Sequence, residues 1–188
     1  MTVLRRAIDL LLEILIALVV ITPFVAVWWG FHSSNLAIHL PRSALEMTPD
    51  RLGLPYENIS FLTEDGLRMA GWFVPHEGSS KAIVICHGWG AERSNVLPST
   101  FFLHRGGYNL LYFDFRNHGE SQGDRSSLGR LETMDLSAAL SYLASKKTAQ
   151  SRWTGVWALS MGGGCCDHGG RRPARDQGGR RGEPVFVL

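Results

Sequence analysis

The sequence predicts an α/β domain, and the pattern of its apolar segments carries this prediction. Three short runs are apolar on both faces, as strands buried in a parallel sheet are: 82–86, 110–113 and, more weakly, 155–159. Two stretches between them, 95–104 and 131–144, have hydrophobic residues at helical spacing. Before them, within 57–74, two runs of alternating apolar and polar residues flank an Asp-Gly turn and indicate a β-hairpin. This order is typical of a mostly parallel sheet with flanking helices.

The composition sets limits on the class of protein. A chain of 188 residues that is 45% hydrophobic and 19% charged has enough apolar residues for one folded domain. The net charge of +2 is small and the basic residues are spread along the chain, so no nucleic-acid partner is expected. Cys86 lies in an apolar run as a buried thiol does, and no disulfide framework is indicated. Nothing in the sequence calls for a cofactor.

The N-terminal segment reads as a membrane anchor. Residues 14–31 are free of charge, follow Arg5 and Arg6, and end near Trp28 and Trp29, which suit an interfacial aromatic belt. We therefore expect a single transmembrane anchor at 1–31 that contacts the lipid bilayer. A cleaved signal peptide and a buried core helix are the alternatives. A signal peptide has a shorter apolar stretch and a small-x-small cleavage site, which Trp28-Trp29-Gly30 does not provide.

The charge distribution around this segment also predicts an orientation. Arg5 and Arg6 favour a cytoplasmic N-terminus, and this orientation places the following domain outside the cytoplasm. The hydrophobic residues of 32–56 show no sustained helical or strand spacing, so we expect this segment to be a connector between the membrane and the domain.

The first chemical motif is the segment 156–163, Val-Trp-Ala-Leu-Ser-Met-Gly-Gly. Ser160 stands where a buried strand meets a glycine-rich helix start, and the segment resembles the nucleophile elbow. Such a turn needs small neighbours and a strained serine backbone. Gly162 fits, and Ala158 replaces the usual first glycine by the smallest possible change. By itself, a serine before glycines is more often an ordinary loop.

Two further motifs each follow a predicted strand. His87-Gly88-Trp89-Gly90 comes directly after the most apolar run. The segment 112–121, Tyr-Phe-Asp-Phe-Arg-Asn-His-Gly-Glu-Ser, follows the next one, and its Asn117 stands where glycine is common. Asparagine tolerates a positive φ well, so the turn survives this replacement.

Together the three motifs resemble the α/β-hydrolase superfamily over about residues 57–164. The chain is most similar to a membrane-anchored bacterial branch related to serine aminopeptidase-like and dienelactone hydrolase-like proteins. The resemblance implies an N-terminal half of an α/β-hydrolase fold, preceded by the transmembrane helix. It also implies cleavage of an ester, a thioester or a peptide, without fixing the substrate.

The resemblance further implies roles for individual residues. Ser160 is the expected nucleophile, and the backbone amides of Trp89 and Met161 are the expected oxyanion-hole donors. The remaining motif residues are expected to be structural: His87, Gly88, Asp114, Arg116, His118 and Gly162. A catalytic part for His87, Asp114, Arg116 or His118 is the less favoured alternative, because a base must reach the serine proton.

The triad's other two residues are not apparent. In this fold an Asp or Glu and then a His follow the nucleophile along the chain. After Ser160 the only histidine is His168, eight residues on, which a helix would carry roughly 12 Å away along its axis. We therefore expect this chain to be inactive. A non-enzymatic, membrane-anchored binding or interaction protein is the alternative.

The composition changes abruptly at residue 165. The tail 165–188 is rich in Gly, Arg and Asp and has no secondary-structure period. Codons can be chosen for residues 165–168 that encode Ala-Ala-Ile-Thr when the reading frame is shifted by one base. Continued in the same way, the shifted frame can encode an alanine-rich helix followed by a strand. We expect a frameshift in the coding DNA near the codons of 162–164, and a bare sheet edge at the strand 156–159. The alternative, a metal site of Cys165, Cys166 and His168, lacks the usual C-x2-C spacing.

Overall fold

The computed structural model describes residues 2–169 and 186–187, which fall into two units divided after Ile38. The first unit is the helix α1, Thr2–Ile38. Its stretch Arg5–Ile38 is long and apolar enough to cross a membrane. The helix continues beyond the predicted anchor boundary at residue 31, so the first part of the predicted connector is helical. Between Gly30 and Pro41 the sequence contains no helix-breaking residue, and α1 ends shortly before that proline.

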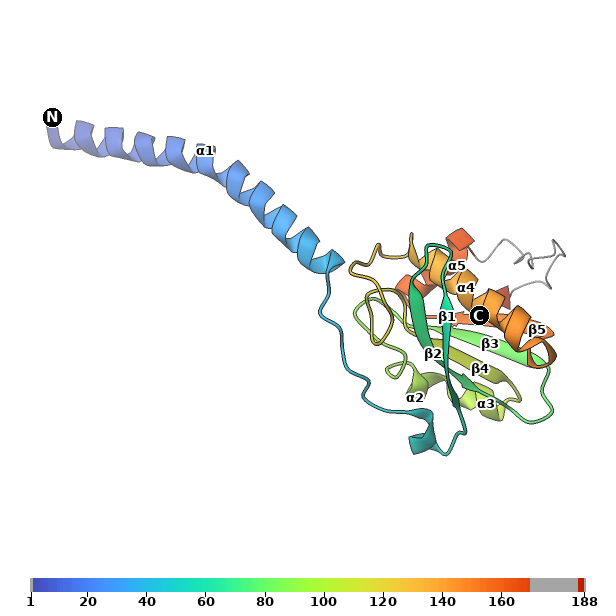
Figure 1. The fold of residues 1–188 in the computed structure, drawn as a ribbon. Helices are drawn as coiled ribbons and strands as arrows, with labels where there is room; N and C mark the ends of the chain where they lie inside the picture. The colour runs from blue at the N-terminus through green and yellow to red at the C-terminus, as the bar shows by residue number, and fades with distance from the viewer. Residues whose placement is uncertain (1, 170–185, 188) are drawn as a thin grey trace. The chain divides into compact units, whose positions relative to one another are not determined.

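The second unit is the α/β domain (Figure 1). Its elements are, in chain order, η1 Pro49–Leu52, β1 Glu57–Leu62, β2 Arg68–Val74, β3 Lys81–Cys86, α2 Leu97–Thr100, α3 Phe102–Arg105, β4 Asn109–Phe113, α4 Glu132–Lys146, η2 Thr148–Gln150, β5 Trp153–Ala158, α5 Met161–Gly169 and β6 Phe186–Val187.

The strands form one sheet in the order β1-β2-β4-β3-β5-β6. β2 pairs antiparallel with both β1 and β4, whereas β4, β3, β5 and β6 run parallel. The predicted hairpin and the three predicted strands are confirmed, but only Gly155 and Val156 of β5 are fully buried. Because β3, β4 and β5 are parallel, the loops after their carboxyl ends gather at one edge of the sheet, where open α/β folds bind ligands.

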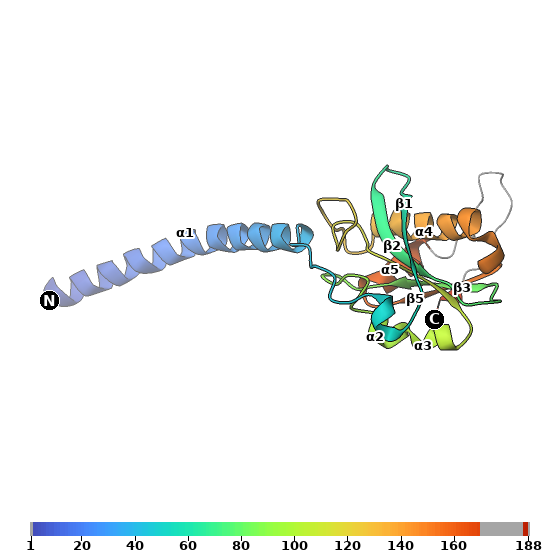
Figure 2. The same cartoon turned by 60° about the horizontal axis from the view of Figure 1, so that its bottom comes forward.

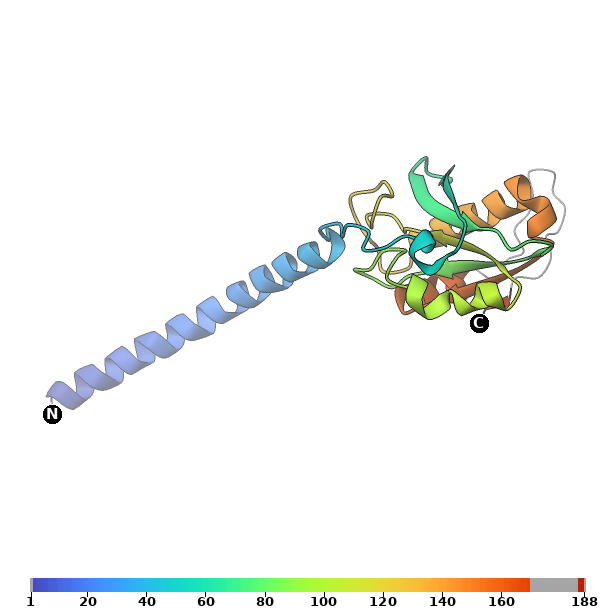
Figure 3. The same cartoon turned by 90° about the horizontal axis from the view of Figure 1, so that it is seen from below.

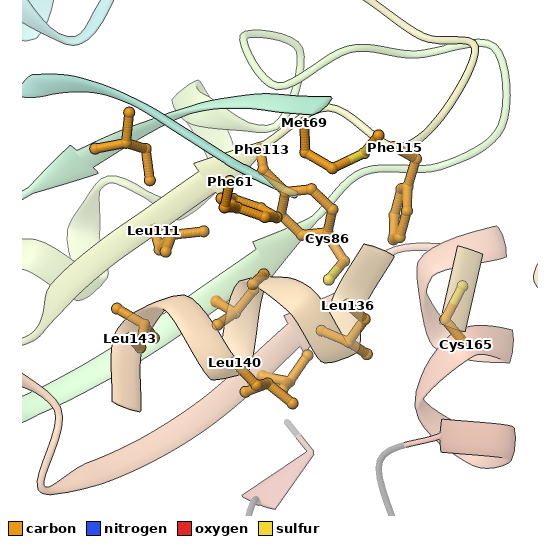
Figure 4. Close-up of a cluster of buried hydrophobic side chains, with 14 of the residues drawn as sticks. Phe61, Met69, Cys86, Leu111, Phe113, Phe115, Leu136, Leu140, Leu143 and Cys165 are labelled. Carbon is orange, nitrogen blue, oxygen red and sulfur yellow. The ribbon is translucent and has the colours of Figure 1, made fainter. Parts of the chain in front are cut away.

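Helices cover both faces of the sheet, which explains why the central strands are apolar throughout. Figures 2 and 3 show α4 on one side of the sheet and the pair α2 and α3 on the other. Leu111 and Phe113 belong to the cluster beneath α4, and Leu110 and Tyr112 belong to the opposite cluster. Figure 4 shows the first cluster, in which Leu136, Leu140 and Leu143 of α4 face the strand residues.

Two sequence expectations about local structure were wrong. The single helix predicted over 95–104 is split into α2 and α3 at Phe101. The backbone of Phe101 has φ −60° and ψ −23°, which is 3-10 geometry, so the chain tightens there without leaving a helical path. The expected bare edge of β5 is also partly covered, because β6 pairs with Gly155 and Val156. Phe186 and Val187 are among the few hydrophobic residues of the tail.

The tail is also more regular at its start than the sequence suggested. The helix α5 extends past residue 164 to Gly169, so the first residues of the tail continue the helix that begins at the elbow. The expectation for residues 170–185 and 188 lies outside the described part of the chain.

Candidate active site

Ser160 lies in a sharp turn between β5, which ends at Ala158, and α5, which begins at Met161. Its φ is +52°, a left-handed conformation that non-glycine residues rarely adopt. The turn is closed by a hydrogen bond from the Gly162 N–H to the Leu159 carbonyl, at 3.0 Å. Ser160 is exposed. The strained backbone predicted for a nucleophile elbow is therefore present at this serine.

Close packing behind the turn explains its small residues. A Cβ atom added to Gly162 would lie 2.8 Å from the Cβ of Cys86 and 3.0 Å from the carbonyl oxygen of Cys86. A Cβ atom added to Gly88 would lie 3.4 Å from the Cβ of Ser160. The loop after β3 thus lies directly against the predicted nucleophile, and side chains at these glycines would separate the two.

The predicted oxyanion donors come from two different segments of the chain. Met161 is the first residue of α5, where backbone N–H groups have no acceptor within the helix. Trp89 follows Gly88 in the loop after β3. The indole of Trp89 is 42% exposed and the Leu159 side chain 50% exposed, so apolar surface borders the exposed serine.

His87 is fully buried and uses both ring nitrogens on backbone groups. Its Nδ1 contacts the Gly88 carbonyl oxygen at 2.7 Å, and its Nε2 accepts the Phe115 N–H at 3.0 Å. Burial lowers the pKa of His87 to about 3. A neutral ring with both nitrogens engaged fits a structural role better than a general-base role.

His118 is arranged in the same way. Its Nδ1 contacts the Arg116 carbonyl oxygen at 2.7 Å, and its Nε2 accepts the Gly90 N–H at 3.1 Å. Burial lowers the pKa of His118 as well. The two imidazoles lie 5.1 Å apart between their centroids.

Asp114 is buried directly after β4 and joins the loop after β3 to the loop after β4. It accepts hydrogen bonds from the backbone N–H of Arg93 at 2.7 Å and from that of Glu120 at 2.9 Å, and it pairs with the Arg93 guanidinium. Arg93 also pairs with Glu120 and lies over the Trp72 ring at 4.4 Å. Burial raises the pKa of Asp114, against the opposing effect of Arg93.

Arg116 joins three segments of the domain. Its side chain is 3% exposed and pairs with Asp135 of α4 at 2.7 Å and with Asp65 of the hairpin turn at 2.8 Å. Asn117, next in the chain, has φ +60°, which confirms the positive φ predicted there. Asp114 and Arg116 are thus held within the architecture of the loop, and neither is presented to Ser160 as a free acid or base.

The sequence motifs did not reveal three buried charged residues near this site. Arg93, Glu132 and Asp135 are buried and charged, and none of them belongs to a recognised motif. The available signal was indirect, because a charge placed next to a buried strand requires a partner. Among the described residues no group of three or more His, Cys, Asp or Glu side chains is placed to hold a metal ion. The side chains of Cys166 and His168, named in the alternative metal site, lie outside the described part.

Comparisons with known proteins agree with this architecture. Residues 81–167 match the family model for the alpha/beta hydrolase fold. The esterase Pf2001 of Pyrococcus furiosus is 33% identical with a TM-score of 0.65, over 70% of this chain and 52% of the esterase. An α/β-hydrolase of Vibrio vulnificus shares the fold at 21% identity, with a TM-score of 0.58 over 81% of this chain and 51% of that protein.

Relatives found by sequence cover a similar region. A thiohydrolase of Aspergillus aculeatus is 31% identical over 120 residues, which are 62% of this chain and 38% of the relative. An uncharacterized membrane protein of Saccharomyces cerevisiae is 26% identical over 117 residues, 62% of this chain and 40% of the relative. The chain thus spans about two fifths of the length of these relatives. The sheet order, the strained serine turn and the match to the family model together show that the domain of this chain has the alpha/beta hydrolase fold.

Proposed function

We propose that this chain is part of a membrane-anchored serine hydrolase in which Ser160 attacks the carbonyl carbon of an ester, a thioester or a peptide. The observation that carries the proposal is the exposed Ser160 at φ +52°, between a buried strand and a helix N-terminus. The likeness to an esterase and to a thiohydrolase supports acyl transfer as the chemistry.

The proposed step assigns each part of the elbow a task. The Ser160 oxygen adds to the carbonyl carbon and its proton leaves to a base, so negative charge develops on the former carbonyl oxygen. Backbone N–H groups of Met161 and Trp89 would stabilise this charge, since preorganised donors contribute most where charge appears in the transition state. The tetrahedral species then expels the alcohol, thiol or amine and leaves an acyl group on Ser160.

Within the described residues the base is the missing part. His87 and His118, at the same edge of the sheet, already bind backbone groups through both nitrogens. We therefore propose that this chain has at most the residual rate of a site lacking its base, on the order of 10³ to 10⁴ over water. The same observation favours a second candidate function, that of a non-enzymatic membrane-anchored binding protein. The shifted reading frame for 165–188 stays a prediction, which the coding DNA across 162–164 tests.

Slow covalent labelling separates the two candidates. The full chain in detergent micelles is treated with a fluorophosphonate, and the modified residue is identified by mass spectrometry. We expect slow modification of Ser160 that is abolished in Ser160→Ala and unchanged in Ser99→Ala, since Ser99 is exposed in α2 on the other face of the sheet. Labelling no faster than in Ser160→Ala would leave only the binding function.

The pH profile of the labelling tests the missing base. A serine with its own imidazole base reacts at a rate that levels off above the imidazole pKa, near 6.5 in an ordinary environment. Without such a base we expect the rate to keep rising with pH between about 5 and 9, because hydroxide removes the proton instead. A plateau near neutrality would contradict the proposal of a site without its base.

A further inference from the structure

Two imidazoles join the loop after β3 to the loop after β4 in a reciprocal manner. His87 belongs to the first loop and accepts an N–H from the second, that of Phe115. His118 belongs to the second loop and accepts an N–H from the first, that of Gly90. Each ring also binds a carbonyl oxygen of its own loop through Nδ1. We call these four hydrogen bonds the histidine clamp.

Backbone chemistry fixes the protonation of both rings. A peptide N–H only donates and a peptide carbonyl only accepts, so Nε2 of each ring has to be unprotonated and Nδ1 has to carry the proton. His87 and His118 are therefore both neutral and in the same tautomer. Neither ring has a nitrogen left to take a proton from Ser160 without breaking the clamp.

The clamp acts on the two peptide groups that flank Trp89. A peptide group is planar, and the carbonyl of Gly88 and the N–H of Trp89 belong to the same plane and point in opposite directions. Holding the Gly88 oxygen with His87 therefore fixes the direction of the Trp89 N–H. The next peptide plane, which carries the Gly90 N–H, is held by His118. The backbone of Trp89 is thus constrained on both sides.

We propose that His87 and His118 are positioning residues that aim the Trp89 amide at the developing oxyanion beside Ser160. The proposal rests on the proposed function of Ser160. It is supported by the packing, since a Cβ on Gly88 would lie 3.4 Å from that of Ser160. A hydrogen bond to the Gly88 carbonyl also polarises that peptide, and this strengthens its N–H as a donor.

The tautomers give a direct test that does not depend on activity. The full chain in detergent micelles is labelled with ¹⁵N-histidine, and the ring-nitrogen shifts report which nitrogen carries the proton. We expect Nδ1–H for two buried histidines, and His87→Gln and His118→Gln assign their signals. An Nε2–H tautomer or a charged ring at pH 7 for either residue would overturn the clamp.

The effect of the clamp on the backbone of Trp89 can be measured through the NMR signal of the Gly90 N–H. Labelling with ¹³C-carbonyl tryptophan and ¹⁵N-glycine selects Trp-Gly pairs, of which the sequence has two, at Gly30 and Gly90. His118→Phe keeps a ring but offers no acceptor, so the Gly90 signal should move while that of Gly30 stays. In His118→Gln the side-chain oxygen replaces Nε2 as acceptor, and the Gly90 signal should remain near its original position.

Fluorophosphonate labelling of Ser160 then connects the clamp to the oxyanion hole. Loss of one oxyanion donor costs about 10² to 10³ in rate, so misdirecting it in His118→Phe should slow labelling roughly 10- to 100-fold. His118→Gln should restore the rate to within about threefold, and His76→Phe, at the far end of the parallel strands, should leave it unchanged.

The outcomes separate the two proposals. If the Gly90 signal moves in His118→Phe and Ser160 is labelled at the wild-type rate, Trp89 is not an oxyanion donor and the inference is wrong, although the proposed function stands. If the wild-type chain is not labelled while both tautomers are as expected, the proposed function fails, and with it the assignment of the clamp to an oxyanion hole. A slow His118→Phe rescued by His118→Gln supports both.

Discussion

At the scale of single residues, the space behind Ser160 leaves no room for a side chain at Gly162. Gly162 faces the end of β3, where a Cβ would come within 3.1 Å of the His87 carbonyl oxygen as well as closer still to Cys86. Gly163, the next residue of the same helix, has nothing within 4 Å of a Cβ placed on it. Comparing alanine substitutions at these two glycines therefore measures how much a side chain at Gly162 is excluded by steric contact with β3.

Gly162→Ala is expected to destabilise the domain by roughly 1–3 kcal/mol, the usual cost of forcing an extra carbon into a packed site. Gly163→Ala is expected to be neutral or to stabilise by up to about 1 kcal/mol, because alanine favours a helix. Thermal unfolding of the full chain in micelles, followed by near-UV circular dichroism, measures both. Equal melting temperatures for the two variants would show that β3 gives way and that the turn tolerates a side chain.

Residues within a motif were predictable from the sequence, and their partners were not. The serine turn, the clamp histidine His87 and the positive φ of Asn117 follow from short local patterns. Arg93 binds Asp114, which is 21 positions away, and Asp135 binds Arg116 across 19 positions. Such pairs depend on the packing of separate elements, which no local pattern encodes. The hydrogen bond from the Gly90 N–H to His118 likewise depends on the packing of the loop after β3 against the loop after β4.

At the scale of elements, α4 holds the loop before it through one carboxylate. Glu132, the first residue of α4, is buried and accepts four hydrogen bonds from 126–129: from the Ser126 hydroxyl, the Ser127 N–H and hydroxyl, and the Gly129 N–H. A Cβ on Gly129 would lie 3.8 Å from the Met161 carbonyl oxygen, so this loop borders the first turn of α5. Glu132 thereby connects α4 to the helix that carries the elbow.

Glu132→Gln is expected to destabilise the domain by roughly 2–3 kcal/mol at neutral pH, because an amide places a donor against N–H groups and removes the charge from these hydrogen bonds. Burial alone would raise the pKa of Glu132, but hydrogen bonds from Ser127 and Ser126 outweigh burial and hold the pKa below its ordinary value. A depressed carboxyl pKa stabilises the fold above the unfolded-chain value of 4.5 and loses this effect as the pH falls through the folded-state pKa.

The melting temperatures of Glu132→Gln and wild type should therefore converge as the pH is lowered from 7 to about 3. Glu57→Gln is the matched control. The carboxylate of Glu57 pairs with Lys147 at 2.7 Å but is 52% exposed, so its loss should cost less than about 1 kcal/mol. A difference in melting temperature between Glu132→Gln and wild type that stays constant at all pH values would indicate a packing defect rather than the loss of a charge.

Element types were predicted better than element ends. The central strands stand out because helices cover both faces of the sheet and leave no polar positions. The predicted helix at 131–144 is α4, Glu132–Lys146, within two residues at each end. The split at Phe101 and the two-residue strand β6 were missed, because a slight tightening of a helix and a short edge pairing leave no periodic signal.

At the scale of the whole molecule, the chain joins a long apolar helix to a domain with the alpha/beta hydrolase fold. In the part described with side chains, the hydrophobic residues of α1 between Ile8 and Leu36 are all exposed, whereas the domain buries its own in two clusters around one sheet. A helix of this length and composition is long and apolar enough to cross a bilayer. For the proposed membrane-anchored hydrolase, the orientation across the bilayer decides on which side Ser160 would meet a substrate.

Single cysteines and a membrane-impermeant maleimide report this orientation. The background carries Cys166→Ser, since Cys86 and Cys165 are buried. We expect Glu64→Cys, in the exposed hairpin turn, to react in intact spheroplasts of an expressing bacterium, and Thr2→Cys to react only after the membrane is permeabilised. The opposite pattern would place the domain in the cytoplasm and overturn the proposed localisation.

The charges that we propose to set the orientation can be tested in the same assay. Arg5 and Arg6 precede the apolar stretch, while Arg42 and Arg51 follow it at greater distance. Basic residues close to a transmembrane helix are retained in the cytoplasm more strongly than distant ones, so the nearer pair should dominate. Replacing Arg5 and Arg6 with glutamine leaves the second pair to decide, and a fraction of the chains should then invert and protect Glu64→Cys from the reagent. If labelling of Glu64→Cys stays complete in that variant, the orientation does not depend on these arginines and has to be set by the folding or translocation of the domain itself.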